Sequence, residues 1–122
     1  MEATGWKGSM VNTYIPDYGD IVWVVLDPRG GHEQAGRRPA IVISTKEFSL
    51  HTSLAVMCPI TSKTKGLPFE VLLKGKVVQG AVLPIHVKSI DWAAMKVKFI
   101  EKAPKSIADD VSEMIGTIIN LE

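Results

Sequence analysis

The chain has 122 residues, of which 46% are hydrophobic and 22% are charged, and its formal net charge is +1. This composition is typical of a globular protein, and no run approaches the roughly 18 apolar residues of a membrane span. The first residues lack the apolar core of a secretory signal. Cys58 is the single cysteine, which excludes an internal disulfide and a cysteine-rich metal site and favours a reducing cytoplasmic location.

The first nine residues differ in character from the rest of the chain. Gly8 and Ser9 stand directly before Met10, a pattern typical of an expression-tag remnant. A short native polar leader is the alternative interpretation. We expect residues 1–9 to be such a remnant and residues 10–122 to form a single domain.

Apolar and β-branched stretches, bounded by glycine, proline and polar turn residues, predict a series of short strands. Pro39 stands at the first position of one of them, where a missing backbone donor is tolerated. We expect strands at residues 20–27, 39–45, 54–61, 69–73 and 97–102, with shorter pieces in 75–91 that break at Gly80 and Pro84.

The apolar pattern changes to a helical period after residue 105. Ser106 is expected to be the N-cap of a helix over residues 106–120, and Asp109 complements the positive end of its dipole. One face of this helix is apolar and is expected to cover the sheet; it carries Ile107, Val111, Met114, Ile115 and Ile118. The predicted fold is therefore mostly β with α, a small barrel of about five to seven short strands closed by a C-terminal helix.

Basic residues are concentrated in the first half of the chain and acidic residues in the last third. Between Pro28 and Lys76 the bases clearly outnumber the acids, whereas the reverse holds from Ser89 onward. A basic face of this kind could bind a polyanion such as nucleic acid. Chance clustering on a solvated surface is the alternative, and composition alone does not decide between them.

Charged and hydroxyl side chains stand where two of the predicted strands begin and end. Arg38 follows a glycine-rich connection and precedes the strand that starts at Pro39, while Thr61 ends the strand over 54–61. Glu33 is the carboxylate of that connection. An arginine that neutralises a phosphate, a hydroxyl that donates a hydrogen bond and a carboxylate that accepts a proton would form a phosphoryl-transfer site without metal.

Three stretches of the sequence resemble the MazF/PemK (Kid) family of type II toxin–antitoxin ribonucleases. They are PDYGDIVWVVLDPRGGHEQAGRRPAIVIS (16–44), CPITSKTKGLPFEV (58–71) and VKSIDW (87–92). The resemblance covers nearly all of the chain from Tyr14 to Leu121 and is closest to the MazF branch. Their joint occurrence is far more specific than one short motif.

The resemblance implies a small SH3-like barrel that forms a symmetric homodimer. It implies sequence-specific, metal-independent cleavage of single-stranded messenger RNA in the bacterial cytoplasm, and inhibition by a MazE-like antitoxin. The 2′-hydroxyl of the RNA attacks the adjacent phosphate and leaves a 2′,3′-cyclic phosphate and a 5′-hydroxyl. No cofactor or metal is expected.

The family's essential arginine falls on Arg38 and its essential threonine on Thr61. Its Glu-Gln pair falls on Glu33 and Gln34, beside the RNA groove. Arginine stays protonated at ordinary pH, so we favour Arg38 as the electrostatic stabiliser and Glu33 as the general base, although the sequence does not decide which group takes the proton. We expect RNA contacts from Gln34, Arg37, His32, Lys65, Lys63, His86 and Lys88.

The segment before VKSI departs from the family pattern. Ile85 and His86 stand where relatives carry an Asp-Gln pair, and Leu83 stands where the PemK/Kid branch has a catalytic arginine. The catalytic set of that branch is therefore not available here, which favours the mode that uses Arg38 and Thr61. The change also prevents transfer of the recognised RNA sequence, because this segment helps to read bases.

Two rival functions and several structural interpretations stay open at the level of sequence. The gyrase poison CcdB shares the fold and cuts nothing, but its Trp- and Gly-rich C-terminal tail has no counterpart in TIINLE (117–122). A non-catalytic barrel that binds peptide is a third possibility. Cys58, Trp23 and Trp92 are interpreted as core or interface residues, and the three histidines show no metal-site spacing.

Overall fold

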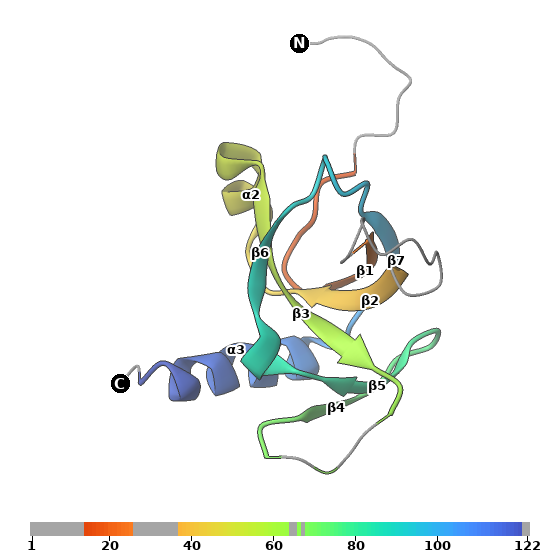
Figure 1. Cartoon of the computed structure of the whole chain (residues 1–122), viewed down its shortest axis with the longest axis vertical. Helices are drawn as coiled ribbons and strands as arrows, with labels where there is room; N and C mark the ends of the chain where they lie inside the picture. The colour runs from red at the N-terminus through yellow and green to blue at the C-terminus, as the bar shows by residue number, and fades with distance from the viewer. Residues whose placement is uncertain (1–13, 26–36, 64–65, 67, 121–122) are drawn as a thin grey trace, which may run out of the picture.

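The structure is a computed structural model that describes residues 14–25, 37–63, 66 and 68–120 (Figure 1). The expected start of the domain at Met10 lies outside this part of the chain. The described elements follow one another as β1 (Asp20–Val25), β2 (Arg37–Val42), α2 (Lys46–Thr52), β3 (Leu54–Thr61), β4 (Val71–Lys74), β5 (Gln79–Val82), the 3₁₀ turn η1 (Pro84–His86), β6 (Lys88–Asp91), β7 (Lys98–Lys102) and α3 (Lys105–Ile118).

The seven described strands form one curled antiparallel sheet, with β3 at its centre. The strand order is β4-β5-β3-β2-β1-β7, and β6 pairs with β3 beside this path. One edge of β3 therefore serves two partners, because Leu54–Met57 pair with β6 and Ile60–Thr61 pair with β5. The strand bends the sheet between these partners, which confirms the predicted barrel-like, mostly β architecture with a C-terminal helix (Figure 1).

Side chains alternate along the strands and fill a separate core on each face of the sheet. The larger core lies under α3 and includes Ile21, Ile41, Cys58, Leu73 and Val111. Cys58 is fully buried there, as predicted, and burial raises the pKa of its thiol to about 12. The smaller core lies on the opposite face and consists of Val22, Val24, Ala40, Val42, Ala55, Met57 and Ile90.

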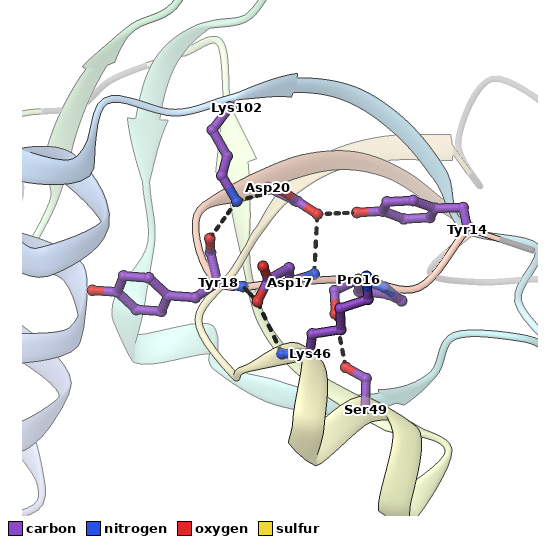
Figure 2. A network of polar contacts seen from close by, with 8 residues as sticks. All are labelled: Tyr14, Pro16, Asp17, Tyr18, Asp20, Lys46, Ser49 and Lys102. Carbon is purple, nitrogen blue, oxygen red and sulfur yellow. Dashed lines mark hydrogen bonds and ion pairs between the residues drawn. The ribbon is translucent and has the colours of Figure 1, made fainter.

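A polar network fixes the segment before β1 (Figure 2). The buried carboxylate of Asp20 accepts hydrogen bonds from the Tyr14 hydroxyl and, at 2.8 Å, from the Lys102 ammonium on β7. Asp17 accepts the backbone N–H groups of Tyr18 and Lys46, at 2.8 and 2.9 Å. These bonds connect the chain entering β1 with β7 on one side and with the start of α2 on the other.

A second carboxylate fixes the hairpin between β4 and β5. Glu101 on β7 accepts the backbone N–H groups of Lys76, Val77 and Val78 at 2.9, 3.0 and 2.8 Å. Burial acts to raise the pKa of Glu101, but these three donors favour the ionised form and the net pKa is lowered. A Cβ at Gly75 would lie 2.5 Å from this carboxylate, so only glycine fits there.

Several predicted boundaries are wrong for identifiable reasons. Gly80 lies inside β5 and does not break it, and Phe69 sits in a turn at φ 70° before β4. α3 begins at Lys105 with Pro104 at the N-cap and no side-chain cap, so the expected role of Ser106 is not realised. Ile118, expected on the covered face of this helix, is 40% exposed.

The helix α2 is absent from the sequence-based prediction. Thr45 caps it by accepting the N–H of Phe48 at 3.2 Å, and Ser53 ends it in the left-handed conformation at φ 63°. The helix has only seven residues, so its sequence carries no helical repeat of apolar positions. In the structure Phe48 and Leu50 are exposed, and Ser49 is the buried residue of this helix.

Candidate active site

The start of β2 and the end of β3 lie at the same end of the sheet. Backbone pairing between the two strands runs from Val42–Met57 to Ala40–Pro59. The same register, continued by two residues, places Arg38 across from Thr61. The sequence predicted both residues at strand ends, and the antiparallel pairing puts those two ends at the same end of the β2–β3 pair.

Both side chains belong to the face of the sheet that carries the smaller core. Alternation puts Arg38 on the same side as the buried Ala40 and Val42, and Thr61 on the same side as Met57. Arg38 is exposed and Thr61 is half-buried at the rim of this core. A guanidinium and a hydroxyl are thus presented to solvent beside an apolar floor.

Local bonds and one glycine fix the position of Thr61. Its Oγ1 accepts the backbone N–H of Lys63 at 3.2 Å, which leaves the hydroxyl proton free to donate elsewhere. Gly80 on β5 passes so close that a Cβ there would lie 2.1 Å from the Thr61 carbonyl oxygen. Glycine at this position therefore permits the β3–β5 pairing that holds the end of β3. From the sequence alone, Gly80 was expected only to interrupt a strand.

Other expected contact residues surround this rim. Lys88 pairs with Met57 across β3 and β6, so it is presented on the same face as Arg38 and Thr61. Lys63 is exposed two residues beyond Thr61. His86 is exposed at the end of η1, along the chain segment that passes from β5 to β6 beside β3.

Arg37 points to the other face of the sheet, although it precedes Arg38 in the chain. Its guanidinium carbon lies 4.5 Å from the ring centroid of Trp23, a cation–π contact. The half-buried Trp23 is thus a platform for Arg37 on the side opposite to the smaller core. Trp92 donates its indole N–H to the Ser49 carbonyl at 3.3 Å and packs against the smaller core, in line with its predicted structural role.

Four expected site residues lie outside the described part of the chain. They are His32, Glu33, Gln34 and Lys65. The described residues include no group of three or more His, Cys, Asp or Glu side chains that could hold a metal ion.

The described arrangement can bind and polarise a phosphodiester. Arg38 and Lys88 supply positive charge, and charge-assisted hydrogen bonds to phosphate oxygens are among the stronger hydrogen bonds in proteins. Thr61 supplies a neutral donor next to them. An extended strand of nucleic acid could therefore lie across this rim with a phosphate between Arg38 and Thr61.

The chain is similar to one protein family and to several of its members over most of its length. The model of the PemK-like, MazF-like toxin of type II toxin–antitoxin systems matches residues 17–119. The endoribonuclease toxin MazF of Escherichia coli is 47% identical over 85 residues, which cover 70% of this chain and 77% of that protein. The E. coli endoribonuclease PemK is 35% identical and covers 83% of this chain and 80% of its own length.

Solved structures give the same result. A MazF crystal structure from Deinococcus radiodurans has a TM-score of 0.80 and 39% identity, covering 89% of this chain and all of that one. A MazE–MazF crystal structure from the same organism has a TM-score of 0.81 and 36% identity with the same coverage.

None of the described helices is long and apolar enough to cross a membrane. The gyrase-binding alternative draws no support from these relatives.

Proposed function

This chain belongs to the PemK-like, MazF-like toxin family of type II toxin–antitoxin systems, and we propose that it is a sequence-specific endoribonuclease that cuts single-stranded RNA without a metal ion. Its relatives of 47% and 35% identity are endoribonucleases by name. The proposal is supported in this chain by the antiparallel pairing of β2 with β3 from Val42–Met57 to Ala40–Pro59; continued by two residues, this register sets Arg38 beside Thr61 on one face of the sheet.

The proposed reaction is an internal transesterification of RNA. The 2′-hydroxyl oxygen forms a bond to the adjacent phosphorus, and the bond from phosphorus to the 5′-oxygen of the next nucleotide breaks. The proton of the 2′-hydroxyl passes to a base, and the guanidinium of Arg38 donates a proton to the departing 5′-oxygen; solvent then returns the base and Arg38 to their starting protonation states, so no net proton is consumed. The products are a 2′,3′-cyclic phosphate and a 5′-hydroxyl, and no water or cofactor is consumed.

Each residue of the site has a separate role in this step. Arg38 neutralises the charge that grows on the non-bridging phosphate oxygens, and Thr61 donates its free hydroxyl proton to one of them. Glu33 takes the proton from the 2′-hydroxyl, since a guanidinium has no acceptor to offer. Lys63, Lys65 and Lys88 hold neighbouring phosphates.

The proposal extends to base reading and to partners. Gln34, His32 and His86 contact bases or sugars of the bound strand. The protein acts as a homodimer in the bacterial cytoplasm. Its inhibitor is a MazE-like antitoxin whose acidic and apolar segment covers the same basic rim, so that antitoxin and RNA compete for one surface. The MazE–MazF crystal structures of D. radiodurans support this choice of partner.

Incubation of the purified protein with a long RNA in excess EDTA tests the proposal. We expect cuts at one short recurring sequence, with 5′-hydroxyl ends that polynucleotide kinase labels directly without prior phosphatase treatment. Arg38→Ala is expected to abolish the cuts, while Lys46→Ala on α2 serves as a matched loss of one exposed charge and keeps them. Intact RNA with the wild-type protein, or cleavage that needs added metal, would refute the proposal.

A further inference from the structure

A second cluster of positive charge lies on the face of the sheet opposite to Arg38. A pocket of about 190 Å³ is lined by Trp23 and Val24 of β1, Arg37 of β2, Lys98 of β7 and Lys96 of the turn before β7. Among the described residues, no carboxylate lines it. Three cationic side chains thus line one pocket together with an indole ring.

Strand pairing brings these residues together from distant parts of the sequence. Trp23 pairs with Lys98 across β1 and β7, and Val25 pairs with Arg37 across β1 and β2. The end of β1 and the starts of β2 and β7 therefore lie at one end of the sheet (Figure 1). Alternation turns Trp23, Arg37 and Lys98 to the same face.

Lys96 enters this pocket from an unfavourable backbone conformation. Its φ is 52°, in the left-handed region that a lysine seldom occupies. The turn is held by bonds from Met95 N to Asp91 O at 3.0 Å and from Val97 N to Trp92 O at 3.2 Å. Glycine would suit this position better, so the lysine side chain is placed here at a cost to the backbone.

We propose that Trp23, Arg37, Lys96 and Lys98 form a second phosphate-binding subsite, which holds the RNA strand on one flank of the cleaved phosphate. The inference rests on the proposed ribonuclease function and deepens it. Arg37 and Arg38 are consecutive on β2, so this pocket and Arg38 lie on opposite faces at the same end of one strand. Cations that track the backbone beside an aromatic ring are the usual means of binding single-stranded nucleic acid without reading its sequence.

An acidic peptide is the other polyanion that such a cluster could hold. RNA is favoured because the cluster is continuous with the Arg38 end of β2 and contains an indole with Arg37 stacked on it, an arrangement suited to a base and its phosphate. The subsite would add affinity for long RNA without taking part in the chemical step.

The test compares two RNAs with 2′-deoxyribose at the cut position, which cannot be cleaved. One contains only the recognised sequence and the other extends it by eight nucleotides on each side. The double variant Lys96→Gly/Lys98→Ala is expected to bind the long RNA about tenfold more weakly and the short RNA unchanged. The slope of log affinity against log salt should fall in magnitude by about 1.4, as expected for two lost phosphate contacts.

Three control variants show whether a loss of RNA affinity comes from the missing charge or from a destabilised fold. Lys96→Gly should not lower the melting temperature, because glycine accepts the positive φ, and Lys96→Arg should keep the affinity. Lys46→Ala/Lys74→Ala removes two exposed lysines on α2 and β4 and should leave both affinities unchanged. Equal binding of the long RNA by wild type and the Lys96/Lys98 variant, equal weakening of both RNAs, or weakening of an acidic antitoxin peptide alone would overturn the subsite.

These outcomes are distinct from failure of the ribonuclease proposal itself. If the wild-type protein leaves a natural long RNA intact in EDTA, the proposed function fails. If it cleaves that RNA in an Arg38-dependent manner while the Lys96/Lys98 variant binds the long analogue normally, only the second subsite fails.

Discussion

Arg37 and Arg38 are neighbours in the chain, but β2 turns their side chains to opposite faces of the sheet. Arg37 stacks on Trp23 at 4.5 Å, whereas Arg38 is exposed beside the smaller core and Thr61. The sequence shows two equivalent cations before Pro39, and only the period of two along the strand separates them. One arginine is therefore available for the reacting phosphate and the other for a flanking one.

Thr61→Val should slow cleavage without unfolding the protein. Valine keeps the β-branched shape that suits the end of β3 but removes the proton that Thr61 would donate to the phosphate. We expect the single-turnover rate constant to fall by about 10²-fold, as for loss of one donor to a developing negative charge. Thr61→Ser restores the hydroxyl and should keep most of the rate; equal rates for the valine variant and wild type would remove Thr61 from the chemistry.

Gly80→Ala should destabilise the protein because the new Cβ would collide with the Thr61 carbonyl, 2.1 Å away, at a φ of 151°. The expected loss of unfolding free energy is about 2 kcal/mol or more, since both overpacking and backbone strain contribute. Urea titration measures it. Gly66→Ala is the matched control: its φ is 66°, but among the described residues no atom lies within 4 Å of the added Cβ, so a loss of only about 1 kcal/mol is expected.

At the scale of elements, β7 holds two parts of the fold in place. Lys102 bonds Asp20 at the start of β1, and Glu101 bonds three backbone N–H groups of the β4–β5 hairpin. β5 in turn pairs with the end of β3, where Thr61 lies opposite Ala81. The carboxylate of Glu101 thus supports the strand that supports the candidate site.

The Glu101 contact predicts a pH dependence of stability. Because the pKa of Glu101 is lowered in the folded protein, its contribution is complete above the ordinary value of 4.5 and is lost as the pH falls through the folded value. Glu101→Gln should therefore cost about 1 kcal/mol at pH 7, a value reduced for solvent screening of this partly exposed carboxylate, and its difference from wild type should shrink as the pH falls below 4.5. Chemical denaturation at a series of pH values measures this difference.

The exposed Glu113 on α3 offers a control for that measurement. Glu113→Gln should change the unfolding free energy little at any pH, since surface charges contribute little to stability. A difference between wild type and Glu101→Gln that stays constant from pH 7 to pH 3 would show that the hairpin does not depend on the charge of Glu101.

The sequence predicted elements where hydrophobic pattern decides the structure and missed them where tertiary contacts do. β1 and β3 are continuous apolar runs and were located within two residues. α2 depends on the Thr45 cap and on Ser49, whose hydroxyl donates to the Pro16 carbonyl at 3.0 Å, a contact 33 residues away in the chain. α3 begins at Lys105, before the expected Ser106 cap, with Pro104 as its N-cap, and its first turns are fixed to the segment before β1 by the Tyr18 hydroxyl, which donates to Asp109 at 2.6 Å.

At the scale of the whole molecule, the two faces of the curled sheet have different structural roles. Its larger core under α3 provides most of the burial, while the smaller core leaves a rim on which strand ends present Arg38, Thr61 and Lys88. The position of Arg38 and Thr61 at strand ends could be inferred from sequence. The cluster of Trp23, Arg37, Lys96 and Lys98 could not, because it depends on a β1–β7 pairing across some 75 residues.

The division of labour between the two faces is the central claim of this account, and single-turnover cleavage by Arg38→Ala and Arg37→Ala tests it most directly. With enzyme in saturating excess over a long RNA in EDTA, Arg38→Ala should lose about 10²- to 10³-fold in the rate constant. Arg37→Ala should keep the wild-type rate constant but should require a higher protein concentration to saturate the RNA. Equal losses of the rate constant in both variants, or an active Arg38→Ala protein, would contradict the account.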